Sequence, residues 1–567
     1  MKNDLETLRH SASHVLAAAI KRLYPNVKLG IGPAIEDGFY YDFDKDSPFT
    51  PEDFEKIEKE MQRIIDEDCK FERFTLSRKD AEKQLKGEPY KLELLKELDE
   101  EPSFYRCGNF VDLCRGPHVE SAGRIKAFKL MRSSAAYWKG DAKNRQLQRI
   151  YGTAFGSSKE LKHYLTMLEE AEKRDHRKLG KQLDLFSIHE EGSGFIFWHP
   201  KGMVLRNLLL DFWRDEHRKE GYVEIQTPIM LNRSLWERSG HWENYRENMY
   251  VTKIDNEEFA IKPMNCPGGM LYYMEKLHSY REFPLRVGEI GTVHRHELSG
   301  VLSGLFRVRC FTQDDAHLFM TPEQITDEIA RLIDFIDRFY RIFGFEYEVE
   351  LSTRPKKYIG SDEQWKMATD GLRNALDKKK VKYQVNEGDG AFYGPKIDFK
   401  VRDCIGRLWQ CGTIQLDMNL PERFGLEYDG PDGKRHRPVM IHRVIYGSLE
   451  RFIGVLIEHY AGKFPLWLTP VQVKLLTMNE QNVSFALKVK SELEANRLRV
   501  EIDDRNETIG RKVREAQMEK TNYIVTIGDK EVQNKVLAVR DREGKVTFGV
   551  KIDDFITDVL EKVNNRR

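Results

Sequence analysis

Two pairs of side chains with metal-binding or proton-transfer chemistry occur in the first quarter of the sequence. His10 and His14 lie within His-Ser-Ala-Ser-His, and Cys114 and His118 lie within Cys-Arg-Gly-Pro-His. Histidines four positions apart share one face of a helix. Four nitrogen and sulfur groups of this kind could bind zinc. They could equally form a pocket for proton transfer around a bound water, and the residues alone leave both possibilities open.

A second set of charged side chains begins at Arg295, which is followed two positions later by Glu297. In a strand, this spacing places both side chains on one face of the sheet. An arginine can hold a phosphate or a carboxylate through two parallel hydrogen bonds, and a glutamate can accept from an amino group. Surface ion pairs produce the same pattern by chance, so it is weak evidence by itself.

A third segment, Gly447-Ser448-Leu449-Glu450-Arg451, has a glycine at the expected start of a helix and an arginine one turn later. Glycine lets a ligand approach the backbone, and a helix N-terminus favours phosphate. The segment therefore predicts an anion site, although the pattern is also weak when taken alone.

The elements that position these residues follow from apolar periodicity. Residues 7–24 and 51–68 are predicted to be helices, the second with Thr50 as its N-cap and Pro51 at its first helical position. Residues 159–184 are charged and predicted to form one linker helix. After residue 186, strand-like alternation with interspersed helices continues to about residue 465.

The last hundred residues have a different pattern, in which predicted strands and helices alternate. The predicted elements are strand 471–478, helix 484–495, strand 498–503, helix 511–519 and strand 523–528. Such alternation predicts a small α/β domain with parallel strands. The proline-bracketed segment 464–470 is the clearest domain boundary in the chain.

Composition limits the class of protein. The chain has 567 residues, with 92 Lys and Arg balanced by 92 Asp and Glu, so any RNA-binding surface must be a local basic patch. The N-terminus is polar, unlike a secretory signal, and no run approaches the roughly 18 apolar residues of a membrane span. The seven cysteines are odd in number and scattered, which argues against a disulfide framework and favours the cytoplasm.

Taken in order, three segments resemble the signature motifs of class II aminoacyl-tRNA synthetases. Residues 224–228 are similar to the first motif, which builds a dimer interface, residues 294–307 to the second, and residues 447–451 to the third. The resemblance narrows to the threonyl-tRNA synthetase family through four further segments. These segments are Lys262 to Gly268, Phe311 to His317, Tyr393 to Asp398 and Gln410 to Asp417.

The resemblance covers nearly the whole chain and implies a multidomain α+β and α/β protein. Residues 1–158 would form an α+β editing domain, 159–185 a linker helix, 186–468 a catalytic domain with flanking helices on an antiparallel sheet, and 469–567 an α/β anticodon-binding domain. The family often carries a ubiquitin-like domain before the editing domain, and His10 falls too early for one here. The family also usually has histidine where this chain has Gly269.

The resemblance assigns site residues in the catalytic domain. The implied zinc ligands, one ion per subunit, are Cys266, His317 and His442. Residues implied for threonine are Gln313, Asp315, Tyr393 and Gln415. Those implied for ATP, with Mg²⁺, are Arg295, Glu297, Arg307 and Arg451, and the catalytic cations are Arg295, Lys396 and Arg451.

Two further sites are implied outside the catalytic domain. The editing residues would be His10, His14, Lys91, Asp112, Cys114 and His118, acting in metal-independent hydrolysis of Ser-tRNA(Thr). The anticodon contacts would be Asn506, Glu531 and Arg540. Editing is needed because a missing methyl group costs only about 1–3 kcal/mol, too little to exclude serine.

The expected partners are L-threonine, ATP, tRNA(Thr) and a second copy of the chain, joined through the first motif, with no membrane. Two alternatives stay open. A class II synthetase for another amino acid, such as proline or serine, would not need the three metal ligands together with Asp315. A non-catalytic RNA-binding relative would usually have lost one of the three ATP arginines, all of which are present here.

Overall fold

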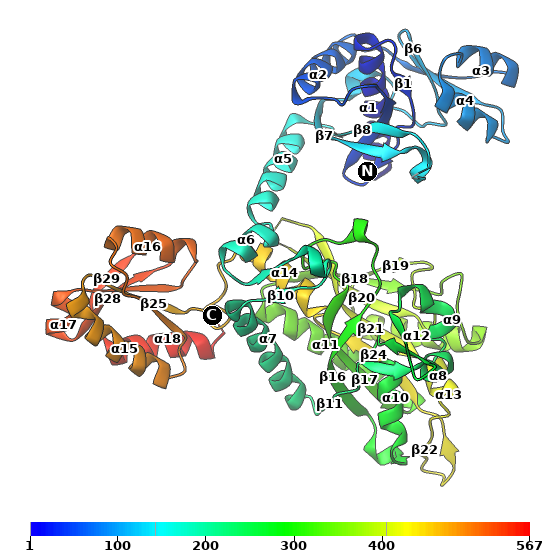
Figure 1. Ribbon diagram of the computed structural model, residues 1–567. Coiled ribbons are helices and arrows are strands. Elements are labelled where there is room, and N and C mark those ends of the chain that lie inside the picture. Colours follow the sequence, from blue (N-terminus) through cyan, green and yellow to red (C-terminus); the bar gives the residue numbers. More distant parts are fainter. Residues whose placement is uncertain (1, 142, 404, 567) are drawn as a thin grey trace. The chain divides into compact units, whose positions relative to one another are not determined.

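The computed structural model describes residues 2–141, 143–403 and 405–566. The chain divides into two compact units, residues 1–169 and 170–567 (Figure 1). Each unit has an apolar core of its own. Within these described parts, every helix is too short or too polar to traverse a lipid bilayer.

The first unit is built around a largely buried helix, α1 (Lys2–Leu23). Its apolar side chains recur at helical spacing and pack against β3 (Gly38–Asp44) and α2 (Pro51–Asp66). The predicted start of α2 is confirmed, because the Thr50 hydroxyl accepts from the Asp53 amide and the Asp53 carboxylate accepts from the Thr50 amide.

Two antiparallel sheets complete this unit. One has the order β1-β3-β8-β7 with β2 paired to β3, and the other has the order β4-β5-β6. The further elements are β1 (Lys28–Leu29), β2 (Ala34–Ile35), β4 (Phe71–Thr75), α3 (Arg78–Gln84), α4 (Pro89–Lys96), β5 (Ser103–Cys107), β6 (Phe110–Leu113), β7 (Ala127–Tyr137) and β8 (Gln146–Phe155).

Two sequence-based expectations are wrong in this part of the chain. A disulfide joins Cys69 to Cys107, which β4 and β5 bring within 5.5 Å between Cα atoms although 38 positions separate them. The predicted linker helix is interrupted, because α5 (Ser158–Lys173) ends and a second helix, α6 (His176–Gln182), follows its N-cap Asp175, whose carboxylate accepts from the Arg177 amide. Among the other cysteines, four are free and Cys404 lies outside the described residues.

An eight-stranded sheet organises the second unit, in the order β11-β16-β17-β24-β21-β20-β18-β19. All neighbours are antiparallel except β11 with β16 and β18 with β19. The strands are β11 (Val223–Ile225), β16 (Leu285–His294), β17 (Cys310–Met320), β18 (Glu346–Ser352), β19 (Tyr383–Asn386), β20 (Lys396–Arg402), β21 (Leu408–Asp417) and β24 (Val439–Val444).

Helices cover one face of this sheet and form the largest core. They are α7 (Pro200–Lys219), α11 (Ile325–Ile342), α12 (Asp362–Lys378) and α14 (Leu449–His459). Alternation along β17 shows why the faces differ: Ala316, Leu318 and Met320 enter the core, whereas Gln313, Asp315 and His317 point to the opposite face. That opposite face is free to carry polar chemistry.

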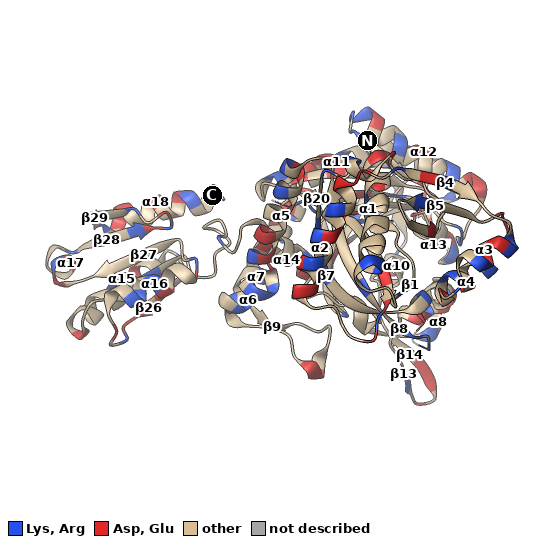
Figure 2. Ribbon diagram, turned by 90° about the horizontal axis from the view of Figure 1, so that it is seen from above, with Lys and Arg blue, Asp and Glu red and all other residues tan. Residues whose placement is uncertain are grey.

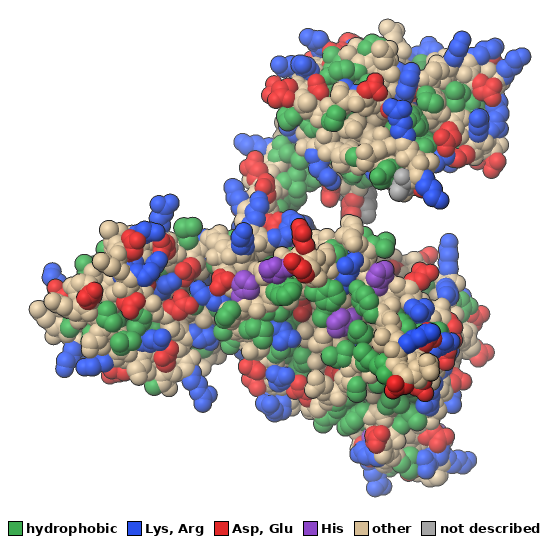
Figure 3. All heavy atoms as spheres, viewed as in Figure 1, with side chains coloured by type: hydrophobic (Ala, Val, Ile, Leu, Met, Phe, Trp, Pro, Cys, Tyr) green, Lys and Arg blue, Asp and Glu red, His purple; other side chains and the backbone are tan. Residues whose placement is uncertain are grey.

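Smaller elements flank the sheet. They are β9 (Phe186–Ser187), β10 (Phe197–Trp198), β12 (Met230–Asn232), α8 (Arg233–Arg238), α9 (His241–Tyr245), β13 (Val251–Ile254), β14 (Glu257–Ile261), α10 (Cys266–Met274), β15 (His278–Ser279), α13 (Asn419–Arg423), β22 (Tyr428–Asp429) and β23 (Arg435–His436). Figure 3 shows apolar side chains gathered on one face of this unit. Exposed apolar residues on and beside β11, β12 and α10 are Val223, Ile229, Met230, Leu271, Tyr272, Met274 and Leu277.

The C-terminal part of the second unit has a separate core and a sheet of order β26-β25-β27-β28-β29. The three strands predicted there pair in parallel, as expected, while β28 and β29 add antiparallel edges. The elements are β25 (Val473–Thr477), α15 (Val483–Ala495), β26 (Val500–Asp503), α16 (Ile509–Met518), β27 (Tyr523–Ile527), α17 (Asp529–Asn534), β28 (Val536–Asp541), β29 (Val546–Lys551) and α18 (Ile552–Asn564). Both signs of charge are interspersed along the helices (Figure 2).

Candidate functional site

A cavity of about 500 Å³ opens on the polar face of the eight-stranded sheet. Strands β17, β21 and β24 supply its floor, and the segments after β16 and before α14 supply its rim. Most of the catalytic-domain residues expected from sequence line it: Cys266, Arg295, Glu297, Arg307, Gln313, Asp315, Tyr393, Gln415, His442 and Arg451. The structure therefore gathers side chains from segments that are far apart in the sequence around one space.

Cys266, His317 and His442 form a compact buried group, with one potential ligand atom of each lying within 4.8 Å of the others. His317 and His442 are register partners on β17 and β24, and Cys266 begins α10. The Nε2 atom of His317 is buried and has no hydrogen-bond partner among the residues that the structure describes. A buried nitrogen without a partner is costly unless another group occupies its lone pair or proton.

Ionisation in this group suits metal binding. Burial lowers the pKa of His317 to about 4, so the ring is neutral near pH 7, as a ligand must be. His442 Nε2 lies 2.9 Å from the Asp417 carboxylate, which places a proton on Nε2 and leaves a lone pair on Nδ1. Burial raises the pKa of the Cys266 thiol, so its thiolate requires a nearby cation.

Polar side chains beside this group could receive a small amino acid. Asp315 lies two positions before His317 on the same face of β17 and accepts from Asn265 Nδ2 at 3.2 Å. Tyr393 donates to Gln415 Oε1 at 2.6 Å. The Gln313 Oε1 atom is buried and lacks a hydrogen-bond partner within the described chain. The pocket thus offers a carboxylate and an amide oxygen to groups that donate hydrogen bonds.

Gly269 lies directly behind the His317 ring. A Cβ atom added at this position would lie 3.2 Å from His317 Nδ1. A larger residue here would therefore press on that imidazole, whereas glycine has no side chain to contact it.

The cationic rim of the cavity carries three arginines. Arg307 Nε donates to Glu297 at 2.9 Å, and Arg295 Nε donates to the Pro263 carbonyl at 3.1 Å. Arg451 lies in the first turn of α14, whose N-cap is Ser448. The strand expected to hold Arg295 and Glu297 ends at His294, so they reach the cavity from irregular backbone rather than from one sheet face.

Lys396 is placed differently from the other expected residues. It is nearly buried on β20, and its ammonium contacts Asp398 at 2.5 Å and Asp389 at 3.1 Å. Neither Lys396 nor His317 is among the residues lining the cavity. To contact a substrate in the cavity, the Lys396 ammonium would have to move toward it.

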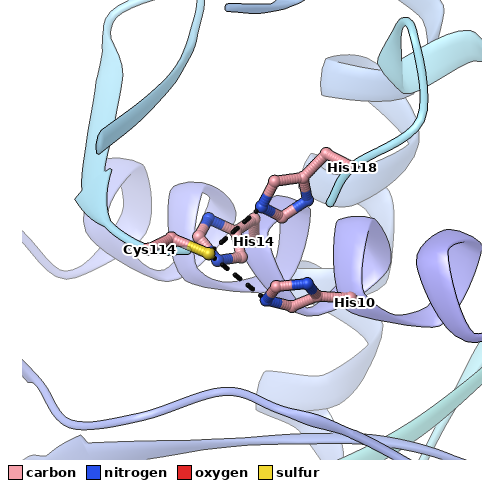
Figure 4. Close-up of side chains that lie close together, drawn as sticks. All are labelled: His10, His14, Cys114 and His118. Atoms are coloured by element: carbon pink, nitrogen blue, oxygen red, sulfur yellow. Dashed lines mark hydrogen bonds between the residues drawn. The ribbon is translucent and has the colours of Figure 1, made fainter. Parts of the chain in front are cut away.

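The first unit brings His10, His14, Cys114 and His118 together, as Figure 4 shows. Cys114 Sγ lies 3.4 Å from His10 Nε2 and 3.4 Å from His118 Nε2. Burial lowers the pKa of all three histidines and raises the pKa of the Cys114 thiol to about 11. Near neutral pH the group therefore consists of uncharged imidazoles and an uncharged thiol.

Lys91 and Asp112 form a buried ion pair beside these four residues, with the ammonium 2.6 Å from Asp112 Oδ1. The other carboxylate oxygen accepts from the Tyr41 hydroxyl at 2.6 Å and lies 3.8 Å from His14 Nδ1. All six residues expected for editing thus occupy one region. Such a group can hold a water and move a proton, and its ligand types would also suit a metal.

The three anticodon candidates do not lie together. Asn506 follows β26 and Glu531 follows β27, so both lie beyond the carboxyl ends of parallel strands. Glu531 also caps α17 by accepting from the Gly528 amide. Arg540 lies on β28 opposite Ile524, toward the other end of β27.

Two residues that contact the site were given no role from sequence. Asn265 hydrogen-bonds Asp315, and Asp417 hydrogen-bonds His442. Asp417 follows Gln415 by two positions on β21, so strand periodicity offered a signal for it. Asn265 precedes Cys266 at a helix start, and only the folded structure brings it to Asp315.

Comparisons with known proteins match the chain in three segments. The tRNA synthetase class II core domain (G, H, P, S and T) matches residues 250–460, the anticodon binding domain matches 472–562, and the threonyl and alanyl tRNA synthetase second additional domain matches 103–151.

Individual relatives are similar to this chain over nearly its whole length. A threonine–tRNA ligase of Acetivibrio thermocellus is 61% identical over 565 residues, covering 99% of this chain and 89% of the relative. One of Clostridium tetani is 61% identical, covering 99% and 88%. A structure titled as the RNA binding domain of threonyl-tRNA synthetase from Cryptosporidium parvum superposes with a TM-score of 0.66 at 42% identity, covering 68% of this chain and 98% of that one.

Proposed function

The chain belongs to the threonine–tRNA ligase family, and we propose that it activates L-threonine with ATP at the cavity of the second unit and transfers it to tRNA(Thr). The observation that carries this proposal is the buried group of Cys266, His317 and His442, of which Cys266 and His442 line the cavity. A synthetase for proline or serine is disfavoured by this group and by the relatives.

We assign zinc to this group. A thiolate and two imidazoles are typical zinc ligands, and three protein ligands leave a position for substrate. The unpartnered His317 Nε2 and the Asp417–His442 hydrogen bond both fit such a ligand set. When bound, zinc would supply a Lewis-acidic centre for amino and hydroxyl groups. One ion per subunit is expected.

Asp315 is proposed to accept a hydrogen bond from the threonine hydroxyl, with Gln313, Tyr393 and Gln415 lining the pocket. Valine has the same shape as threonine but no hydroxyl, and an apolar pocket discriminates between such isosteres by only about a hundredfold. With valine bound instead of threonine, the buried Asp315 carboxylate would receive no hydrogen bond from a substrate hydroxyl. A site built to hydrogen-bond its substrate rejects such an analogue more strongly.

Adenylate formation needs no side-chain nucleophile, so charge and positioning carry the step. We propose that Arg295 holds the α-phosphate, Glu297 the adenine amino group, and Arg307 and Arg451 the γ-phosphate. We propose Lys396 as a further cation that would contact the α-phosphate when bound ATP attracts its ammonium away from Asp389. Mg²⁺ would accompany ATP and be held mainly by phosphate oxygens and water.

For the first unit we propose hydrolysis of Ser-tRNA(Thr). The match of residues 103–151 and the grouping of the six editing residues support this assignment. We favour metal-independent chemistry, because Cys114 Sγ is already in contact with two neutral imidazoles. Lys91 and Asp112 would position water or the terminal ribose.

The remaining assignments follow the family. Residues 1–158, 159–185, 186–468 and 469–567 would serve editing, linking, aminoacylation and anticodon binding, with Asn506, Glu531 and Arg540 as candidate RNA contacts. The exposed apolar residues around β11 and α10 favour a homodimer formed there. We place the enzyme in the cytoplasm, where translation occurs.

Amino-acid-dependent ATP–pyrophosphate exchange tests the central proposal. Exchange should be fastest with threonine, weaker with serine and close to background with valine. Absence of exchange with threonine would remove the enzymatic assignment, and equal rates with valine would remove the role of Asp315.

A further inference from the structure

One buried histidine outside the cavity joins three segments that are distant in sequence. His176 is the first residue of α6 and is 2% exposed. Its Nε2 lies 2.9 Å from the Leu305 amide nitrogen, and its Nδ1 lies 2.8 Å from Glu458 Oε1 on α14. A single imidazole therefore bridges the segment before Arg307 and the helix that carries Arg451.

The partners of His176 determine its protonation pattern. The amide of Leu305 can only donate, so Nε2 must accept, and Nδ1 then carries the proton that is donated to Glu458. Asp175, His176 and Glu458 are spaced closely enough for a metal, but both nitrogens of this ring are already engaged. The group is consequently a hydrogen-bonded bridge.

The segment held by this bridge approaches the imidazole very closely. Gly304 has a φ of +49°, and a Cβ atom at this position would lie 2.1 Å from His176 Nε2. The Phe306 ring packs between two others, 4.2 Å from the His176 ring and 4.0 Å from the Trp409 ring. The absence of a side chain at Gly304 thus lets the backbone approach His176, and the Phe306 ring packs against the same imidazole.

The other end of the bridge holds α14. Arg451 and Glu458 are seven positions apart, about two helical turns, so they lie on the same side of the helix. Arg451 Nε donates to the Phe306 carbonyl at 3.0 Å, while the second oxygen of Glu458 accepts from Arg407. Helix α14 and the segment around Leu305 are therefore connected twice, once near the cavity through Arg451 and once two turns further along the helix through Glu458 and His176.

We propose that His176 is a positioning residue for ATP. By binding the Leu305 amide and Glu458 together, it holds Arg307 and Arg451 in one arrangement at the rim of the cavity. This inference rests on the proposed function, in which these two arginines contact the triphosphate. His176 itself lies behind them and does not line the cavity.

Two substitutions separate the two hydrogen bonds of this bridge. In His176→Asn, the amide nitrogen can still donate to Glu458, but nothing accepts from Leu305. In His176→Gln, the longer side chain can place its oxygen near the former Nε2 and accept from Leu305, while the backbone amide of residue 176, which donates to Glu458 Oε1 at 3.1 Å, keeps the other end of the bridge. In ATP–pyrophosphate exchange, we expect His176→Asn to raise KM for ATP roughly tenfold and to leave KM for threonine unchanged. His176→Gln should stay near the wild-type values.

A matched control is His163→Asn, which replaces an exposed histidine on α5 and should change neither constant. Thermal unfolding of each variant measures its stability. If His176→Asn does not fold, Gly304→Ala tests the same contact from the other side and should also raise KM for ATP.

Three results would overturn the inference: equal rises in KM for ATP and threonine, no change in either constant, or equal impairment of both His176 variants. Arg307→Ala identifies which proposal has failed. If Arg307→Ala raises KM for ATP and His176→Asn does not, only the role of His176 is lost. If Arg307→Ala also has no effect, the proposed ATP contact itself is wrong.

Discussion

His317 and His442 are register partners on β17 and β24, and their imidazole rings meet edge to face with centroids 5.1 Å apart. Because neighbouring strands are less than 5 Å apart in a sheet, this register alone brings the two rings close. Cys266 reaches them from the start of α10. The selection of threonine proposed for this enzyme depends on that arrangement.

Replacing the thiol should remove the metal. In Cys266→Ser we expect the zinc content of purified protein, measured by plasma mass spectrometry, to fall well below one per chain. Threonine-dependent exchange should fall by roughly a hundredfold or more, since even an outer hydrogen-bond partner of a metal ligand is worth about 10–100-fold. Cys310→Ser is the control, because this half-buried cysteine lies outside the metal group. Full zinc content in Cys266→Ser would refute the ligand assignment.

The Asp315 carboxylate should matter for threonine and not for ATP. Asp315→Asn keeps the shape of the side chain but weakens its acceptance of a hydroxyl proton, so KM for threonine should rise roughly 10–100-fold. KM for ATP should remain close to that of the unaltered enzyme. Asp327→Asn, an exposed carboxylate paired with Lys378, serves as the comparison. A selective rise in KM for ATP would contradict the proposed role.

Editing and activation should be separable by mutation. His14→Ala and Cys114→Ala should each slow deacylation of Ser-tRNA(Thr), by roughly a hundredfold if proton transfer is lost. Exchange should be unchanged, because the activation cavity is lined entirely by residues of the second unit. His163→Ala controls for the loss of an imidazole in the first unit. Deacylation at the wild-type rate in both variants would exclude these residues from editing.

The ionisation of Cys114 gives a pH-dependent prediction. Burial raises the pKa of this thiol to about 11, and only the thiolate reacts with an alkylating agent. Its alkylation rate, followed by peptide mass spectrometry, should therefore increase about tenfold per pH unit from pH 7 to pH 10. Glutathione provides a solvent-exposed reference thiol. A rate for Cys114 that levels off near pH 8 would instead indicate a thiolate stabilised by an imidazolium or a metal.

Much of the site was predictable because strand periodicity is a local property. The spacing of Gln313, Asp315 and His317 places them on one face of any strand that contains them, and β17 has them there. The same local chemistry correctly predicted the capped start of α2 at Thr50 and the parallel strands of the C-terminal domain. The family likewise follows from ordered motifs in the sequence, and the relatives confirm it.

Other features depend on which segments become neighbours, and no local pattern encodes that. The disulfide between Cys69 and Cys107 forms because β4 and β5 pair, and the expected strand around Arg295 ends at His294. The break before α6 reflects the cap at Asp175, where His176 turns inward to Leu305 and Glu458. The sequence by itself thus determined the family, the chemical groups and the shared face of Gln313, Asp315 and His317. Only the tertiary structure decided which groups meet, because strand order and helix packing are set by contacts between distant segments.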